Sequence, residues 1–208
     1  LHDALPISMD EARRRLTTLG AIDADGRLTD HGRAIAALPL EPRLAHMLID
    51  AKARGFAAAA ADVAVLLSER GLGGNDADLE VRWRRWRSDR SPRAEAARRM
   101  AERLRRRVPL PAREGLGVGA AEGGSSEPPP SPGPSLPGRG KDLAKALALA
   151  FPDRLSRRRD ASGETWQSVG GRGFRLDSTS SLAGSEWLAV GEVAGRASGA
   201  RILSAAAI

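Results

Sequence analysis

Apolar residues recur at helical spacing through the first half of the chain. From Met9 to Leu19 they lie three or four positions apart, and Gly20 follows as a helix end. Residues 42–54 and 56–70 each carry an apolar face, and a single glycine separates them. Two apolar helices joined by so short a connection predict an antiparallel helical bundle.

A tight hairpin is predicted between the first helix and this bundle. Ile22 and Leu28 flank an Asp-Gly pair, which is a strong turn signal. Thr29 or Asp30 can cap the short helix that follows. Pro42 then suits the first turn of the next helix, because the N–H that proline lacks has no partner within the helix at that position.

Two more helices are expected in an arginine-rich stretch. Asp76 or Asp78 can cap the first of them, which continues through VRWRRWR. The second runs from about residue 92 to 107 and is polar nearly all round. Trp83 and Trp86 lie three positions apart and therefore share a helical face. They suit either stacking on RNA between arginines or packing on the bundle, and we favour packing.

The second half of the chain changes character twice. Residues 108–140 hold eight prolines and eight glycines among 33 residues, a composition that predicts a flexible linker. KDLAKALALAF returns to a helical pattern. The last fifty residues then contain short, partly alternating runs separated by glycine and serine turns, namely ETWQSV, GFRL, WLAVGEV and RILSA. These runs predict a small β-structure of about four strands.

Composition narrows the classes of protein that fit. Aromatic residues make up 3% of the 208 residues, and alanine supplies much of the hydrophobic 41%, so helical packing fits better than a large β-sandwich. Cysteine is absent, which excludes disulfides and cysteine–metal sites. No stretch has the apolar length of a membrane span, and LHDALPIS lacks the features of a secretory signal. We therefore expect a cytoplasmic protein with no membrane partner.

Positive charge is concentrated in one segment. The chain has a net charge of +7 and a pI of about 11.1. Residues 82–107 hold twelve arginines and three acidic residues, which is a local net charge of +9. Such a block favours a polyanionic partner such as nucleic acid, and the candidate contacts are Arg103, Arg105, Arg106 and Arg107. The alternative is a solvated helical face with no partner.

The chain has three histidines, His2, His31 and His46. His31 and His46 could share a metal ion, but no carboxylate spacing supports this interpretation. We therefore expect structural histidines, no metal site and no catalytic residues.

Two stretches resemble a known family. LGAIDADGRLTDHGRAIAALPLEPRLAHMLIDA is similar to the winged-helix to helical-bundle junction of DEAH-type ATP-dependent RNA helicases of the HrpB subfamily. LALAFPDRLSRRR followed by GGRGFRLDSTSSLAGSEWLAVGEV resembles the OB-fold region that follows the bundle in that family. The resemblance implies an α+β chain in five segments: a stray or truncated leader (1–8), a winged-helix remnant (9–40), a helical bundle (41–107), a linker (108–140) and a truncated OB-like region (141–208).

The same resemblance implies a region of a helicase that lacks the ATPase motor domains. Helicases of this family hydrolyse ATP with Mg²⁺ between two motor domains, which need a Gly-Lys-Ser/Thr phosphate loop and an acidic box. Neither occurs in these 208 residues. The resemblance therefore implies an accessory region of a helicase that binds no cofactor itself. Its expected partners are single-stranded RNA or DNA and the motor domains. A free-standing basic nucleic-acid-binding module and a helical protein-interaction domain stay open as alternatives.

Candidate contacts outside the arginine block follow from the same segments. Arg172 lies between two glycines, where the backbone can approach a phosphate closely, and Phe174 or Trp187 could stack on a base. A core position is the alternative for each aromatic residue, and we favour it for Trp187. Arg43 has two possible roles. It contacts the nucleic-acid strand or a motor domain, or it forms an ion pair with Asp50 or Glu41 that fixes the start of its helix. A barrel of about four strands would stay open and expose an edge.

Overall fold

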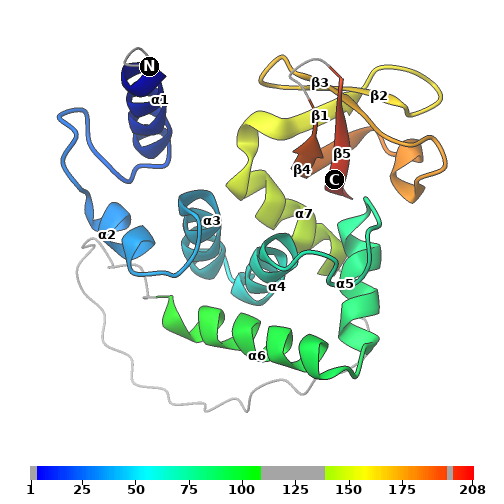
Figure 1. Ribbon diagram of the computed structural model, residues 1–208, viewed down its shortest axis with the longest axis horizontal. Helices are drawn as coiled ribbons and strands as arrows, with labels where there is room; N and C mark the ends of the chain where they lie inside the picture. The colour runs from blue at the N-terminus through cyan, green and yellow to red at the C-terminus, as the bar shows by residue number, and fades with distance from the viewer. Residues whose placement is uncertain (1–3, 109–138, 196–198) are drawn as a thin grey trace, which may run out of the picture.

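The computed structural model describes residues 4–108, 139–195 and 199–208 (Figure 1). A helical part and a small β-barrel lie side by side, which confirms the expected α+β class. The expected linker falls almost wholly outside the described residues. The helices are α1 (Ala4–Thr18), α2 (Asp30–Ala36), α3 (Pro42–Ala53), α4 (Ala57–Ser68), α5 (Leu79–Ser88), α6 (Pro92–Arg107) and α7 (Arg139–Ala150).

The winged-helix segment has the expected local chemistry. Ile22 and Leu28 form an isolated antiparallel bridge across the Asp-Gly turn. The Thr29 side chain caps α2 by accepting a hydrogen bond from the N–H of Gly32. Gly32 is required there, because a Cβ atom at this position would lie 1.9 Å from the carbonyl oxygen of Ala21. The first helix starts at Ala4, within the residues that the sequence pattern set aside as a leader.

The bundle is built around α3 and α4. Both helices have buried apolar faces, and α3 begins with Pro42 as expected. Asp78 caps α5 and Ser91 caps α6, each through its side-chain oxygen. Trp83 and Trp86 are both buried in the core, which agrees with packing rather than base stacking. Their indole N–H groups donate to the Asp62 carboxylate and the Ala94 carbonyl.

The β-part is a closed barrel of five strands in the order β1-β2-β3-β5-β4. The strands are β1 (Leu155–Arg158), β2 (Thr165–Ser168), β3 (Gly173–Arg175), β4 (Trp187–Ala194) and β5 (Ala200–Ala207), with 3₁₀ turns at Pro152–Arg154 and Ser181–Gly184. The β3–β5 pair is parallel and the other pairs are antiparallel. A five-stranded Greek-key barrel of this kind is an OB-fold.

The expectation of an open, four-stranded barrel was therefore wrong. The strand that was missed is β1, whose sequence LSRR has no apolar alternation beyond Leu155. It pairs with β2 on one side and β4 on the other, and so closes the sheet. Closure removes the exposed edge that an open sheet would present.

Helix α7 lies between the bundle and the barrel (Figure 1). It packs against α3 and α4 on one side and against β4 and β5 on the other. Leu143 and Leu147 of α7 are fully buried. The bundle core continues into the barrel wall through Ala189 and Ala206, while a second core fills the barrel interior around Trp166 and Phe174.

Candidate nucleic-acid interface

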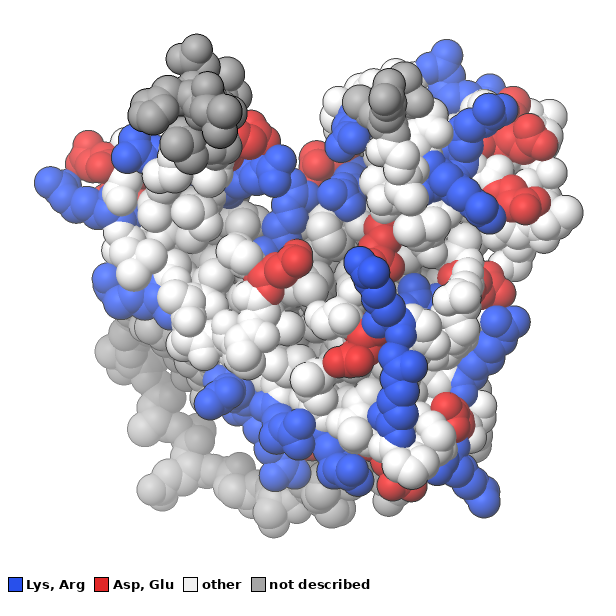
Figure 2. Space-filling view, in the orientation of Figure 1, with Lys and Arg blue, Asp and Glu red and all other residues white. Residues whose placement is uncertain are grey.

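The surface is notched between α1 and the barrel. In Figure 2 a hollow separates the two lobes at the top of the view, and Lys or Arg side chains lie on both of its walls. Arg154, in the turn before β1, lies near three arginines of other segments whose charges lower its pKa: Arg15 from α1, Arg43 from α3 and Arg172 from the β2–β3 loop. We call this set the notch cluster.

Arg154 is the most enclosed member of the notch cluster. Burial lowers its pKa from the ordinary value, Asp153 opposes this, and the nearby charges of Arg43, Arg172 and Arg15 lower it further. Its guanidinium lies over the Phe151 ring, 4.7 Å from the centroid, and donates to the carbonyl of Gly191. Its buried Nε–H finds no acceptor among the described residues. The cluster therefore concentrates positive charge that the protein itself balances only in part.

Arg43 joins the bundle to the barrel entrance. Its Nη1 atom lies 2.7 Å from an Asp153 carboxylate oxygen, and its guanidinium lies 5.5 Å from the Phe151 ring centroid. The sequence-based partners, Asp50 and Glu41, were wrong. Asp50 instead approaches Arg54 and His46. Arg43 is partly buried and already paired with Asp153. It therefore adds positive charge to the notch cluster but has fewer N–H groups free to bind a ligand.

Arg172 is exposed on the loop that connects β2 to β3. The loop is held by its backbone, because the N–H of Arg172 donates to the Ser168 hydroxyl and its carbonyl accepts from the Ser168 N–H. Gly171, with a φ of 79°, makes the turn that this loop needs. Its guanidinium forms no ion pair with any residue in the described ranges.

Phe174 and Trp187 have the opposite exposure to the one expected: Phe174 is buried and Trp187 is exposed. Phe174 is 1% exposed and packs in the barrel core, so its proposed stacking on a base was wrong. Trp187, for which a core position was favoured, is 37% exposed. Its ring lies 5.7 Å from the Arg157 guanidinium, which its cross-strand partner on β1 supplies. An exposed indole beside an arginine is a surface on which a base can stack.

A shallow hollow of about 550 Å³ lies over β2 and β3. Its rim includes Arg159, Gln167 and Arg175, and Gly173 and Gly199 leave its floor open. Strands 2 and 3 form the usual oligonucleotide-binding face of OB-folds. Of the arginine run at 157–159, to which the sequence analysis gave no role, Arg159 is the member that lines this hollow.

The arginine block is mostly neutralised by the protein itself. Arg82 is buried, and Arg84, Arg85 and Arg99 each face an acidic residue within 4.0 Å. Arg105 and Arg106 share the carboxylate of Glu102, whose pKa their hydrogen bonds lower. Within the part of the chain that the structure describes, Arg103 and Arg107 form no ion pair.

These two exposed arginines rim an apolar groove between α4 and α6. The groove has a volume of about 610 Å³, and Leu40, Val65 and Met100 are among its lining residues. Helix α6 packs on α4, whereas the barrel packs on α7, so the arginines of α6 are separated from the notch cluster by the width of the bundle (Figure 1). The sequence-predicted contacts therefore fall in two places: Arg43 and Arg172 at the notch, and Arg103, Arg105, Arg106 and Arg107 on α6.

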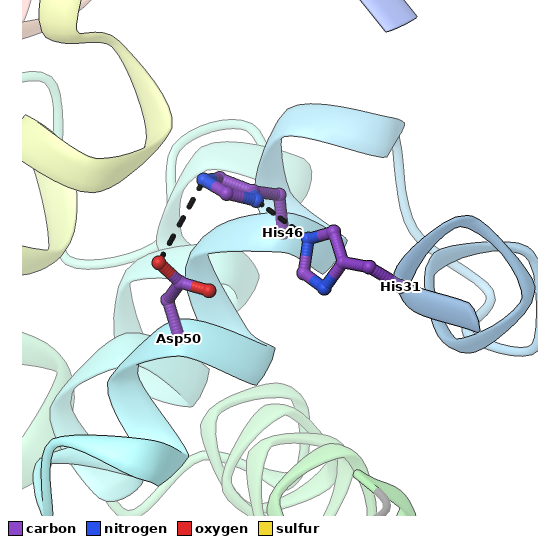
Figure 3. Close-up of side chains that lie close together, drawn as sticks. All are labelled: His31, His46 and Asp50. Atoms are coloured by element: carbon purple, nitrogen blue, oxygen red, sulfur yellow. Dashed lines mark hydrogen bonds and ion pairs between the residues drawn. The ribbon is translucent and has the colours of Figure 1, made fainter. Parts of the chain in front are cut away.

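His31 and His46 meet at the contact between α2 and α3 (Figure 3). The Nε2 atom of His31 lies 2.8 Å from Nδ1 of His46, and the rings are perpendicular. On the other side of the ring, Nε2 of His46 lies 3.9 Å from the Asp50 carboxylate. Burial lowers the pKa of His46 from its ordinary value, Asp50 opposes this, and His31 and Arg54 lower it further. The carboxylate that the sequence analysis found missing is Asp50, one helical turn after His46.

Known proteins share the fold of this chain. Residues 12–40 match the family described as "Helicase associated domain (HA2), winged-helix". Together with the bundle and OB-type barrel that follow, this match defines the class of the chain as a helicase-associated region.

The particular relatives are HrpB proteins. The ATP-dependent RNA helicase HrpB of Escherichia coli K12 is 34% identical over 182 residues, which are 88% of this chain and 18% of HrpB. The crystal structure of the E. coli DExH-box NTPase HrpB covers 95% of this chain with a TM-score of 0.68 and 33% identity. A second crystal structure, of the E. coli DEAH/RHA helicase HrpB, also covers 95%, with a TM-score of 0.66 and 31% identity.

The chain belongs with the helicase-associated part of HrpB-like proteins. It spans 18% of the length of the curated relative, and 20% and 21% of the two solved chains. None of the described helices has the length and apolar character needed to cross a membrane.

Proposed function

We propose that this chain is the accessory nucleic-acid-binding region of an HrpB-like RNA helicase. It holds a single strand of RNA or DNA in the notch between α1 and the barrel and forms one wall of the strand channel. The observation that carries this proposal is the notch cluster. Four arginines from segments far apart in sequence concentrate charge where the winged helix, the bundle and the barrel meet. Phosphates are the groups that such a cluster attracts most strongly.

The barrel adds contacts to bases. Arg172 meets the backbone of the strand, and Trp187 replaces Phe174 as the ring on which a base stacks, with Arg157 beside it. The hollow over β2 and β3 continues this surface with further arginines on its rim. These contacts tolerate any base, because stacking and phosphate pairing carry little sequence information.

The α6 block serves as a second and weaker contact. Arg103 and Arg107 are exposed and reach phosphate, while Arg105 and Arg106 share their charge with Glu102. ATP and Mg²⁺ belong to the motor domains of the helicase, and this chain hydrolyses no nucleoside triphosphate by itself. We propose that the region acts in the cytoplasm, together with those motor domains.

Fluorescence anisotropy of a labelled single-stranded RNA, measured from 50 to 200 mM salt, tests the proposal. Three double variants remove the same charge: Arg15→Gln with Arg172→Gln at the notch, Arg103→Gln with Arg107→Gln on α6, and Arg84→Gln with Arg99→Gln as a control. The control arginines are exposed and paired within their own helices. Arg43 is left intact because its ion pair with Asp153 is structural.

The notch variant should lose about tenfold in affinity at low salt. Its log–log salt dependence should become shallower by about 1.4, since each single-strand phosphate contact contributes about 0.7. The α6 variant should lose less, and the control should bind like the unmodified chain. Equal binding by the notch variant and the control would remove the notch from the interface. No binding by the unmodified chain even at 50 mM salt would overturn nucleic-acid binding by this region altogether.

A further inference from the structure

Two histidines and one carboxylate converge where the winged-helix segment meets the bundle. His31 comes from the first turn of α2, and His46 and Asp50 come from successive turns of α3. One ligand atom from each of the three lies within 4.8 Å of the other two. Figure 3 shows His31 and Asp50 on either side of the His46 ring, each joined to a different nitrogen of that ring by a dashed line.

We propose that His31, His46 and Asp50 bind one divalent transition-metal ion, with Zn²⁺ as the best match. This site is independent of nucleic-acid binding, and its test does not use RNA. Two imidazoles and one carboxylate are borderline ligands that suit Zn²⁺, Co²⁺ and Ni²⁺ better than Ca²⁺ or Mg²⁺, which prefer oxygen.

Binding of one ion by all three side chains requires His46 to rearrange, because His31 lies at Nδ1 of that ring and Asp50 lies at Nε2. Zn–N bonds are about 2.0–2.1 Å long, so two nitrogens on a tetrahedral ion lie about 3.3 Å apart. The two ring nitrogens are now 2.8 Å apart and share a hydrogen bond. The rings must separate by roughly half an ångström, and the His46 ring must turn so that one of its nitrogens faces Asp50 as well as His31. The ion then replaces the hydrogen bond between the two rings. Rotation of these partly exposed side chains can supply that movement.

A metal ion can reach the site, and the cation that now competes for Asp50 can move away. His46 and Asp50 keep 20% and 28% of their side-chain surface exposed, so an ion can enter and a water molecule can complete its coordination. The competing cation is Arg54, whose Nη2 lies 3.7 Å from the Asp50 carboxylate. That arginine side chain is 61% exposed and can turn into solvent when the ion binds.

The ion would fasten two parts of the chain together. Helix α2 has seven residues and contacts the bundle mainly through α3. A metal bridge from His31 to two residues of α3 would hold the winged-helix segment against the bundle more firmly than one hydrogen bond does. The angle between α1 and the barrel, and therefore the notch, would become more rigid.

Isothermal titration of the tag-free chain with ZnCl₂ tests the site, with the visible absorption of added Co²⁺ as a second readout. We expect one ion per chain and Co²⁺ d–d bands between about 500 and 700 nm, as imidazole–carboxylate coordination produces. His31→Gln and Asp50→Asn should each weaken binding by more than about tenfold, because even the loss of an outer-shell partner costs about 10–100-fold. His2→Gln, which changes the remaining histidine, is the matched control and should bind like the unmodified chain.

Far-UV circular dichroism separates a lost ligand from a lost fold. Asp50→Asn keeps the size of the side chain on a helix surface, so it remains informative if His31→Gln unfolds. EDTA should lower the melting temperature of the zinc-loaded chain and leave that of Asp50→Asn unchanged. Absence of zinc binding at micromolar concentrations would overturn the proposal, and so would equal zinc affinity in the unmodified chain, Asp50→Asn and His31→Gln.

Discussion

At the scale of single residues, Asp62 shows how the bundle tolerates a buried acid. Its carboxylate accepts the indole N–H of Trp83 at 2.8 Å, and Arg87 lies 4.0 Å away. Burial raises the pKa of Asp62 above its ordinary value of 3.8, and the Trp83 hydrogen bond and Arg87 only partly oppose this. A carboxyl whose pKa is raised by folding destabilises the folded state when it is ionised.

The buried carboxyl of Asp62 makes the stability of the fold depend on pH. Above the folded pKa the charged carboxylate costs stability, and this cost disappears as the pH falls through the folded pKa toward 3.8. Asp62→Asn keeps an acceptor for Trp83 and removes the charge. The variant should therefore be at least as stable as the unmodified chain at pH 8 and should lose this advantage toward pH 4. Urea unfolding of both proteins across this range measures the difference, and a difference that is the same at every pH would contradict the assignment.

Arg82 belongs to the basic block by sequence and to the core by structure. It is 5% exposed, donates to the Leu66 carbonyl at 2.8 Å, and lies 3.7 Å from the Glu192 carboxylate on β4. Arg82→Met leaves these acceptors without a donor and should lower the unfolding free energy by about 3 kcal/mol. Arg84→Gln, two residues later on the exposed face of α5, should change it by less than about 0.5 kcal/mol. Chemical denaturation distinguishes the two, and equal effects would mean that the buried contacts of Arg82 stabilise the fold no more than an exposed ion pair does.

The sequence could not show which individual side chains of the candidate site are exposed. In the run from Trp187 to Val190, both alternate sets are apolar. Leu188 and Val190 fill the barrel core, while Ala189 faces the bundle and Trp187 is exposed. A one-residue change of register exchanges the two faces of a strand. Alternation therefore could not show whether Trp187 or Phe174 is the exposed aromatic residue. Both faces of β4 are apolar because one faces the barrel interior and the other packs against the bundle.

At the scale of secondary-structure elements, local chemistry made most helices predictable. Caps, prolines and turn glycines act within four residues, so Thr29, Pro42, Asp78 and the bounds of α6 could be identified from the sequence. Strand β1 could not, because its pairing partners lie 8 to 12 residues away on β2 and 30 to 34 residues away on β4. The notch cluster was invisible for the same reason, since residues 15, 43 and 172 approach Arg154 only in the folded chain.

The β1–β2 turn is an element held by one acid. Asp160 accepts hydrogen bonds from the hydroxyl of Thr165 and from the backbone N–H groups of Thr165 and Glu164. The Thr165 hydroxyl, with further help from Ser162 and these N–H groups, lowers the pKa of Asp160 to about 2. The lowered value means that Asp160 stabilises the fold at pH above about 4, and that this contribution is lost as the pH falls through the folded pKa.

Asp160→Asn should therefore open the turn at neutral pH, where the carboxylate is needed. Amide exchange in residues 158–166 should become faster in the variant at pH 7 and should match the unmodified chain near pH 2. Asp177→Asn, in a different turn of the barrel, should leave this segment unchanged. Equal exchange of residues 158–166 in Asp160→Asn and the unmodified chain at pH 7 would show that the barrel itself, rather than Asp160, fixes the turn.

At the scale of the whole molecule, α7 decides whether bundle and barrel unfold together. Leu147 of α7 is fully buried, and a Cβ atom on Gly191 of β4 would lie 3.0 Å from it. The same helix packs on α3 and α4, so its core residues serve both parts at once. Contacts shared in this way make two structural units one cooperative unit.

Leu147→Ala should consequently destabilise both parts equally, by about 3 kcal/mol for a buried leucine. Native-state hydrogen exchange measures this directly: the most protected amides of residues 44–51 and of residues 188–206 should lose protection by the same factor, about 150-fold. Leu203→Ala, whose side chain is 43% exposed on the barrel, should change neither by more than a few fold. If residues 188–206 kept their protection while the bundle lost its own, the barrel would fold independently. The notch would then be a joint between two bodies, and the strand bound there would be held by surfaces free to move apart.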